Sequence, residues 1–368
     1  MRVIVVGGGI GGLAAAIALR GAGHEAVVLE RAARLESVGA GITLFANAMH
    51  ALDLLGVGDA VRAHGAAARR SAIRTSSGRQ LAALPDDLLQ GAVAIRRGDL
   101  QAALHDAAEG VCLGAVVTSV EPARDGASAK LDDGTEVRGD LLIGADGVRS
   151  LVRAAVAAAQ PRYGSYTAWR GISPVTIEAG QLTESWGVGE RFGLVDIGGE
   201  TYWFATANAR EGEPEQAGER KPELMRRFAS WHAPIEAVLE ATPDSAILRN
   251  DVYYLDPLPR WSSGRIVLLG DAAHASTPGV GQGAAQALED AVALADALHD
   301  GAEVAAALAR YESVRRPRAE LTLKRSRQAD RAAQLANPLG CRVRNAIVSR
   351  IPAGVQRRQL APLVHSAS

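Results

Sequence analysis

A glycine-rich turn near the N-terminus carries the first residues whose types and spacing point to chemistry. Gly7, Gly9 and Gly12 form the pattern G-x-G-x-x-G, and Glu30 follows 18 residues after the last of them. The glycines allow a tight turn, the approach of a pyrophosphate to the backbone and the close packing of a helix, whose N-terminus supplies N–H donors. An acid such as Glu30 accepts hydrogen bonds from a ribose 2′-hydroxyl and disfavours a 2′-phosphate. The pattern predicts a dinucleotide site that does not hold NADP.

A second glycine-rich turn lies more than 250 residues further along the chain. Asp271 follows Gly270, and Gly281 and Gly283 precede an alanine-rich segment. The acid is placed to accept hydrogen bonds from ribityl hydroxyls, and N–H groups at the start of a helix can stabilise negative charge on a reduced flavin ring. A ligand held at both turns must be long, and FAD is the natural candidate. We assign no role to His274.

A third acidic turn lies between these two. Asp146 and Gly147 come directly after the apolar run Leu141–Ile143, and Ser150 and Arg153 follow a few residues later. An acid at the end of a strand can bind ribose or ribityl hydroxyls, but the same local sequence also fits an ordinary helix N-cap. On the residues alone, both interpretations of Asp146 stay open.

The elements that must position these turns begin with a βαβ unit. Val3–Val6 predicts a buried strand, Leu13–Ala22 a helix of small residues, and Ala26–Leu29 a second strand. Alternating strands and helices predict a parallel sheet. Further along, the sequence Asp-Asp-Gly at residues 132–134 predicts a hairpin turn, and Arg265–Leu269 predicts another buried strand.

The segment from about 165 to 255 differs from the rest, because it holds most of the aromatic residues. It predicts a β-rich insertion, whereas the chain from Ala284 to about Arg350 predicts helices. The fold class is therefore α/β: a Rossmann-like FAD-binding domain interrupted by a β-sheet substrate domain, with C-terminal helices. We assign residues 1–71, 96–163 and 256–300 to the FAD-binding domain, 72–95 and 164–255 to the β-sheet domain, and 301–368 to the C-terminal helical region.

Composition argues against several kinds of partner. A net charge of -1 provides no electrostatic field that would attract nucleic acid. An aromatic content of 4% argues against a base-stacking surface. No apolar run reaches the roughly 18 residues of a membrane helix, so we expect no membrane insertion. Cys112 and Cys341 lack metal-ligand spacing, so we expect no metal and two free thiols in a reducing cytoplasm.

One charge imbalance stands out near the C-terminus. From Tyr311 to Arg358, twelve Lys and Arg residues oppose three Asp and Glu residues. This pattern is typical of a solvated helical face. The alternative is a docking surface for an anionic partner, such as a carrier protein or NADPH.

Together, the three turns resemble the motifs of single-component (class A) FAD-dependent aromatic hydroxylases of the para-hydroxybenzoate hydroxylase type, and the resemblance covers nearly the whole chain. In that family the first turn holds ADP, the middle motif touches FAD and the passing NAD(P)H, and the Gly-Asp motif holds the ribityl chain. The segment Gly39–Ile42, with Asn47, is similar to the family's loop beside the isoalloxazine, and Arg97 to its FAD-contacting arginine. The resemblance implies these cofactor-binding residues: Gly7, Gly9, Gly12, Glu30, Arg31, Gly41, Arg97, Asp146, Asp271, Gly281 and Gly283.

Within the β-rich insertion, the sequence is similar to the salicylate- and urate-hydroxylase-like subgroup. In urate hydroxylase an arginine and a tyrosine line the substrate site, and the resemblance implies Arg191 and Tyr202 as the catalytic residues here. A cation at this place favours an acidic or enolic ring substrate. The alternative is that Tyr202 belongs to the core and Arg191 is a surface charge. A strand places Tyr202 and Phe204 on one face and Trp203 on the other.

The resemblance implies a monooxygenase that uses FAD, NAD(P)H and O2 to hydroxylate an aromatic or heteroaromatic small molecule through a flavin C4a-hydroperoxide. An epoxidase or a prenyl-type reductase would share the FAD domain, and a non-catalytic FAD-binding regulatory protein is an alternative of another class. Neither the substrate nor the choice between NADH and NADPH follows from the sequence. We expect a cytoplasmic protein that is a monomer or a homodimer.

Overall fold

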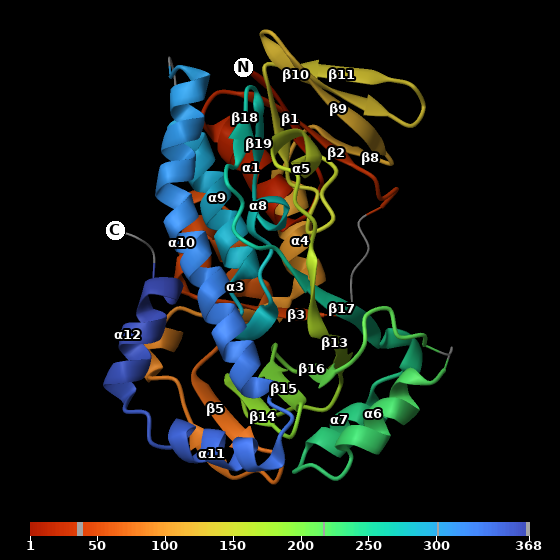
Figure 1. The fold of residues 1–368 in the computed structure, drawn as a ribbon, viewed down its shortest axis with the longest axis vertical. Coiled ribbons are helices and arrows are strands. Elements are labelled where there is room, and N and C mark those ends of the chain that lie inside the picture. Colours follow the sequence, from red (N-terminus) through yellow and green to blue (C-terminus); the bar gives the residue numbers. More distant parts are fainter. Residues whose placement is uncertain (35–39, 216–217, 300–301, 366–368) are drawn as a thin grey trace.

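A six-stranded sheet forms the centre of the upper lobe of this computed structural model (Figure 1). The structure describes residues 1–34, 40–215, 218–299 and 302–365. The strand order is β18-β19-β12-β1-β2-β8, and every neighbouring pair is parallel except β18 with β19, which confirms the predicted parallel sheet. The strands are β1 (Arg2–Val6), β2 (Glu25–Glu30), β8 (Val111–Leu113), β12 (Leu141–Gly144), β18 (Ser262–Ser263) and β19 (Ile266–Leu268). Because β1 and β12 are buried almost throughout, their sequences are continuous apolar runs.

Alanine-rich helices pack beside this sheet. α1 packs against α9, which in turn packs against α10. A Cβ at Gly11 would lie 2.7 Å from the side chain of Leu269 and 3.1 Å from Ala287, so glycine lets α1 and α9 approach closely. The helices of this lobe are α1 (Ile10–Gly21), α2 (Ala46–Leu54), α3 (Gly58–His64), α4 (Arg97–Ala107), α5 (Arg153–Val156), α8 (Asp271–His274) and α9 (Gly283–Ala297).

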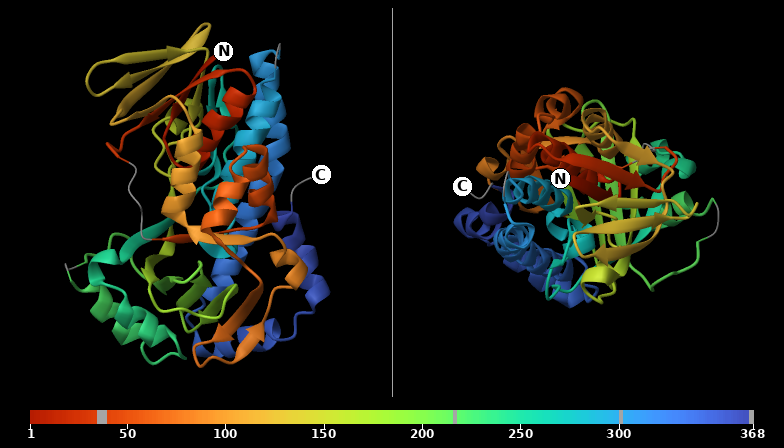
Figure 2. Two further views of the ribbon diagram at one scale, coloured as in Figure 1. Left: turned by 180° about the vertical axis from the view of Figure 1, so that it is seen from behind. Right: turned by 90° about the horizontal axis from the view of Figure 1, so that it is seen from above.

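A seven-stranded sheet forms the lower lobe, with strand order β17-β13-β16-β15-β14-β5-β6. Its strands are β5 (Arg70–Thr75), β6 (Gln80–Ala82), β13 (Arg162–Ser173), β14 (Gln181–Trp186), β15 (Glu190–Asp196), β16 (Thr201–Asn208) and β17 (Leu248–Tyr254). Two helices, α6 (Arg220–Phe228) and α7 (Ile235–Ala241), pack on its outer face, as Figure 2 shows from behind. Trp203, Phe192 and Phe228 fill that contact, with the rings of Phe192 and Trp203 stacked at 5.6 Å.

The β-rich insertion that the sequence predicts also contains two helices, α6 and α7. Both helices are short, nine and seven residues long. Leu224 and Phe228 of α6 are fully buried against the sheet, and so are Ile235, Val238 and Leu239 of α7. Packing against the sheet therefore stabilises two helices that are too short to be stable alone.

Two smaller sheets complete the β-structure. β3 (Gly41–Leu44), β7 (Val93–Arg96) and β4 (Ala66–Ala67) form an antiparallel sheet between the lobes. The segment 72–95 thus divides between two sheets, since β5 and β6 belong to the lower lobe and β7 pairs with β3. β9 (Val117–Ala123), β10 (Gly126–Leu131) and β11 (Glu136–Gly139) form the other sheet, and the pairing of β10 with β11 confirms the predicted hairpin.

The long helix α10 (Val304–Ala333) joins the two lobes (Figure 1). In the upper lobe the hydroxyl of Tyr311 donates to the carbonyl of Leu268 at 3.1 Å, and in the lower lobe the hydroxyl of Tyr166 donates to Asp330 at 3.0 Å. α11 (Pro338–Val348) and α12 (Ala353–Val364) follow, so the helices extend beyond the predicted end near residue 350. Three short 3-10 helices complete the fold: η1 (Asp86–Leu89), η2 (Asp244–Ala246) and η3 (Pro278–Val280).

Candidate active site

The turn between β1 and α1 has the geometry that a pyrophosphate needs. Gly7 has a φ of 106°, and a Cβ at Gly12 would lie 1.9 Å from the Gly7 carbonyl oxygen, so both positions require glycine. A Cβ at Gly9 would meet nothing within 4 Å. The space above Gly9, at the N-terminus of α1, is therefore open to a ligand, and the turn fits one end of a dinucleotide.

Glu30 lies at the end of β2, beside this turn. Its carboxylate accepts the N–H of Gly8 at 2.6 Å and the N–H of Ala32 at 2.8 Å. The two bonds fix the carboxylate next to the turn, where a ribose hydroxyl can reach it. Arg31 is exposed, and Gly39 lies outside the described residues.

Asp146 has the geometry of a local cap. One oxygen accepts the Ser150 hydroxyl at 2.5 Å, and the other accepts the N–H groups of Leu151 at 2.7 Å and Val152 at 3.1 Å. Its loop therefore already uses both oxygens, and contact with the cofactor stays a prediction. Arg153 is buried and donates to three backbone carbonyls, which binds this loop to α8 through Ala272.

Asp271 begins α8 at the carboxyl end of β19. The side chain of Asp271 is exposed to solvent, although many protein atoms lie around its carboxyl group. Burial raises the pKa of its carboxyl, while the nearby His274 and Arg97 act in the opposite direction. Arg97 and Asp271, which the sequence separates widely, thus lie near one another. We call the open space beside Asp271 and Gly9 the cleft.

Asp290 of α9 holds the turn in front of Asp271. It accepts the N–H of Gly270 at 2.9 Å, and the same oxygen lies 2.5 Å from Nε2 of His274. Burial would raise the pKa of Asp290, but His274 and Arg315 lower it to about 2. Asp290 is therefore a carboxylate that positions the Gly-Asp turn, and His274 is part of this support rather than a group that faces the cleft.

The segment before α9 packs against the start of α2. Gly281 is left-handed, with a φ of 65°, and a Cβ there would lie 3.9 Å from the ring of Phe45. Asn47 donates to Gln282 at 3.0 Å, yet Oδ1 of Asn47 and Nε2 of Gln282 are buried without a partner in the described part of the chain. Unpaired buried donors and acceptors are costly unless a ligand satisfies them, and a flavin ring edge carries both kinds of group. These residues therefore fit an isoalloxazine beside Gly281 and Gly283.

Tyr202 lies on the face of the lower sheet that packs on β3. A Cβ at Gly41 would lie 2.5 Å from the Tyr202 ring, so the tyrosine packs directly on β3. Burial raises the pKa of Tyr202, while the nearby charges of Arg170 and Arg97 lower it. Phe204 lies next to Tyr202 on the same face, with 6.2 Å between ring centroids. Trp203 points to the opposite face, as the strand pattern predicts.

Arg191 occupies a different part of that face. It is buried and forms ion pairs with Asp330 at 3.0 Å and Glu184 at 3.4 Å, and its Nε donates to Thr206 at 3.1 Å. Strand pairing places Arg191 opposite Thr206 and Tyr202 opposite Val195, so the two predicted catalytic residues are four positions apart along the strands. These contacts favour a structural role for Arg191, which links the lower sheet to α10. Its predicted contact with a substrate is untested.

Arg170 is a residue that sequence reasoning missed. It pairs with Phe204 across β13 and β16 and therefore lies on the same face as Tyr202. No carboxylate of the described residues pairs with Arg170. Alternation along the predicted strand places Arg170 on the same side of the sheet as Ala168 and Ile172. Only the three-dimensional structure shows that no acid faces it.

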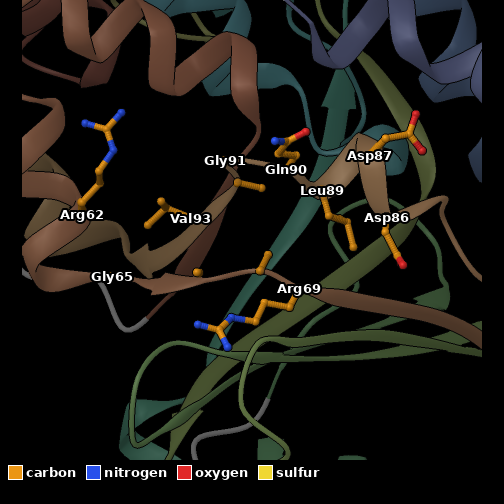
Figure 3. Close-up of a pocket in the computed structure, with 12 residues that line it drawn as sticks. Arg62, Gly65, Arg69, Asp86, Asp87, Leu89, Gln90, Gly91 and Val93 are labelled. Carbon is orange, nitrogen blue, oxygen red and sulfur yellow. The ribbon is translucent and has the colours of Figure 1, made fainter.

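Two open cavities lie outside this cleft. The larger, of about 660 Å³, is bordered by Arg69, Asp86 and Leu89 among others (Figure 3), and none of its lining residues belongs to the three motifs. The smaller, of about 310 Å³, adjoins the middle motif and is lined by residues that include Arg149 and Ser150. We therefore locate the candidate site by the residues of the three motifs and not by these two cavities.

Ranges 1–34, 40–215, 218–299 and 302–365 contain no group of three or more His, Cys, Asp or Glu side chains that could hold a metal ion. Within the same ranges, no helix has the length and apolar character needed to cross a membrane.

The fold and the three turns define a flavoprotein with a dinucleotide site held at two ends. The family model named FAD binding domain matches residues 1–326. The chain belongs to this family, and FAD is its cofactor.

Several relatives with known names are similar over almost the full length. Aurachin C monooxygenase/isomerase of Stigmatella aurantiaca is 44% identical, with 99% of each chain covered. The 2-heptyl-3-hydroxy-4(1H)-quinolone synthase of Pseudomonas aeruginosa is 34% identical, with 97% of this chain and 96% of the relative covered. HpxO of Klebsiella pneumoniae, complexed with FAD and uric acid, superimposes with a TM-score of 0.90 at 29% identity, over 98% of this chain and 97% of HpxO. Within its family, the chain is an FAD-dependent monooxygenase of the aromatic hydroxylase type.

Proposed function

We propose that this enzyme hydroxylates a planar heteroaromatic ring that carries an acidic or enolic oxygen, with NAD(P)H and O2 as co-substrates. The observation that carries the proposal is the pair formed by Arg170 and Tyr202 on the face of the lower sheet toward the cleft. A guanidinium without an acidic partner attracts an anionic or polarised oxygen, and the tyrosine hydroxyl adds a second point of attachment.

FAD, when bound, supplies the redox chemistry: it accepts a hydride from NAD(P)H and transfers one oxygen atom of O2 to the ring, and the other leaves as water. The chain's own residues bind and orient the reactants. Arg170 and Tyr202 hold the ring oxygen and favour its deprotonated form. The negative charge of the deprotonated oxygen raises the electron density on the ring. The N–H groups at the start of α9, near Gly283, form the positive end of the helix dipole. They stabilise negative charge that develops near them.

An apolar substituent on the ring also has a place to lie. Leu182 packs against two apolar clusters, one that contains Val195 and Tyr202 and one that contains Phe45 and Leu363, so the two clusters meet at this residue. The Pseudomonas relative is named for a quinolone with a heptyl chain, and HpxO binds uric acid. A bicyclic ring with an alkyl substituent would use both the polar pair and the apolar clusters.

The NAD(P)H contact belongs beside the middle motif. Arg149 is exposed at the smaller cavity, 5.1 Å from the ring of Tyr253, and lies on the loop that Asp146 caps. A cation at the rim of a cavity suits a dinucleotide phosphate. The free thiols of Cys112 and Cys341 fit a cytoplasmic location, which we keep as part of the proposal.

The test is a screen of the FAD-loaded enzyme with quinolones, purines and hydroxylated aromatic acids. NADH and NADPH oxidation is followed together with O2 uptake and product mass. The proposal predicts substrate-stimulated oxidation of the reduced nicotinamide and a product heavier by one oxygen atom. NAD(P)H oxidation without O2 uptake would instead indicate a reductase, and no stimulation by any ring would indicate a regulatory protein.

A further inference from the structure

Helix α11 presents an apolar ridge to solvent. Leu339, Val343 and Ile347 are spaced four residues apart, so they lie along one side of the helix. They keep 68%, 60% and 59% of their surface exposed. Three large apolar side chains in a row on one helix face form a contiguous patch, which a single exposed leucine does not.

The opposite side of α11 fastens it to the molecule. Cys341 and Arg344 are buried, Arg344 donates to the carbonyl of Gly187 at 3.1 Å, and its guanidinium lies 5.2 Å from the ring of Trp186. The helix is therefore held in one orientation, and the ridge faces outward in the folded enzyme.

A neighbouring turn carries a further exposed apolar side chain. Val188, in the turn between β14 and β15, is 47% exposed. The N–H of Gly189 donates to the carbonyl of Leu335 at 2.8 Å, just before α11, and so holds this turn against the start of the helix. By contrast, Leu54 on α2 and Val314 on α10 are as exposed, at 61% and 59%, but each is the single large exposed apolar residue of its helix.

The charge around the ridge has one sign. Residues 331–368 contain six arginines and no Asp or Glu. Arg344 is buried and Arg357 pairs with Asp87, whereas Arg342, Arg350 and Arg358 are exposed and have no carboxylate partner among the described residues. We call Leu339, Val343, Ile347, Arg342 and Arg350 the α11 surface.

The basic character predicted for residues 311–358 is thus concentrated at α11 and α12. On α10, several arginines already pair with acids of the same chain, which leaves them little charge for a partner. These are Arg315 with Glu289 and Asp290, Arg316 with Glu312 and Glu320, Arg318 with Glu289, and Arg327 with Asp256.

The place of α11 in the fold suits a flat partner. The helix lies near one end of the longest axis of the molecule and runs across that axis (Figure 1). A helix laid crosswise at the end of an elongated body can meet a plane along its whole length.

We infer that the α11 surface docks the enzyme on an anionic lipid membrane. A fixed helix with an apolar ridge and flanking arginines is the pattern of an interfacial helix, which inserts its apolar side chains between headgroups while its cations attract anionic lipids. A second copy of the chain is a poor occupant, because a two-fold interface must be self-complementary and this surface would bring arginines against arginines. The inference does not depend on the proposed substrate.

The experiment measures flotation of the full-length, FAD-loaded enzyme with vesicles. Phosphatidylcholine vesicles with and without phosphatidylglycerol are compared at low and high salt. We expect co-flotation with the anionic vesicles at low salt, and loss of about tenfold in the partition coefficient for the triple change Leu339→Ser, Val343→Ser and Ile347→Ser. The change Arg342→Glu with Arg350→Glu is expected to abolish the preference for anionic vesicles.

The matched control is the pair Leu54→Ser and Val314→Ser, which removes equally exposed side chains elsewhere and is expected to leave flotation unchanged. FAD absorbance and melting temperature, measured on every variant, verify that each is folded. Equal flotation of wild type and the triple variant, or no flotation with anionic vesicles, overturns the inference. A concentration-dependent dimer in light scattering that the triple variant abolishes also overturns it, because the ridge would then be a contact between copies.

Discussion

Arg170 and Arg191 lie on one face of the same sheet but have different neighbouring side chains. Arg191 faces two carboxylates, whereas Arg170 faces the hydroxyl of Tyr202. A buried charge without its partners is strongly destabilising, while a cation at the edge of a cleft is free to bind a ligand. Neutralising Arg170 should therefore affect ligand binding, whereas neutralising Arg191 should affect the stability of the fold.

We predict that Arg170→Gln raises KM for the ring substrate by about 10- to 100-fold, the range expected for loss of a charge-assisted hydrogen bond, and leaves the melting temperature nearly unchanged. Arg191→Gln should lower the stability by about 3–5 kcal/mol, because it leaves Asp330 buried without its cation. Steady-state kinetics and thermal unfolding of both variants check this. A raised KM with unchanged stability for Arg191→Gln would restore it to the substrate site.

Asp271 connects cofactor binding to pH. Burial raises the pKa of this carboxyl above its ordinary value, so it takes up a proton at a higher pH than an exposed aspartate does. Only the carboxylate accepts hydrogen bonds at both oxygens. We predict that FAD affinity declines as the pH falls toward that raised pKa, and that Asp271→Asn weakens binding about tenfold or more and removes the pH dependence. Fluorescence titration of the apoenzyme with FAD measures this, with Asp296→Asn, an exposed acid of α9, as the control.

At the scale of elements, α9 carries the carboxylate that supports the Gly-Asp turn. The pKa of Asp290 is held near 2, below that of an aspartate in the unfolded chain, so the stabilisation is complete above the unfolded value and is lost only as the pH falls toward 2. We predict that Asp290→Asn lowers the free energy of unfolding by about 2–5 kcal/mol, and that this loss is the same at pH 8 and at pH 5. Urea unfolding at both pH values provides the measurement. A loss that grows toward pH 5 would mean that the pKa of Asp290 is raised rather than lowered.

The parts of the structure that the sequence predicted are those fixed by local patterns. The turn at Gly7–Gly12 and the strand before Asp146 depend on neighbours a few residues away, and the structure has them where they were predicted. The partners of Arg191 were out of reach, because Asp330 lies 139 residues later on another element. Arg170 belongs to no motif, and its value as a binding residue comes from the absence of an acid opposite it, which local spacing does not encode.

The same limit explains the missed helices α6 and α7. The two helices are only nine and seven residues long, and the sheet that buries Leu224 and Phe228 is formed by strands on either side of them in the chain. The face that carries Arg170 and Tyr202 is set by strand register, since β13, β16 and β15 bring residues around 170, 204 and 193 together.

At the scale of the whole molecule, α10 makes the two lobes one unit. It hydrogen-bonds the upper lobe through Tyr311 and the lower lobe through Asp330, and a Cβ at Gly279, in the loop before α9, would lie 2.7 Å from that same Asp330. Unfolding of one lobe therefore exposes buried polar groups of the other.

We predict a single cooperative thermal transition that FAD shifts upward, followed equally by far-UV circular dichroism and by tryptophan fluorescence. Four of the five tryptophans lie in the lower lobe and report on it, namely Trp169, Trp186, Trp203 and Trp231. Asp330→Ala is expected to separate the two signals, with the fluorescence transition at the lower temperature. Coincident transitions in that variant would show that α10 does not couple the lobes through Asp330.

Gly193 faces Phe204 across β15 and β16, and a Cβ there would lie 2.0 Å from the phenyl ring. The ring therefore lies flat over the backbone of the neighbouring strand, on the face that also carries Arg170 and Tyr202. We predict that a methyl group at position 193 lifts this ring away from the sheet. One mutational step would then change the room above the sheet while the polar pair stays in place.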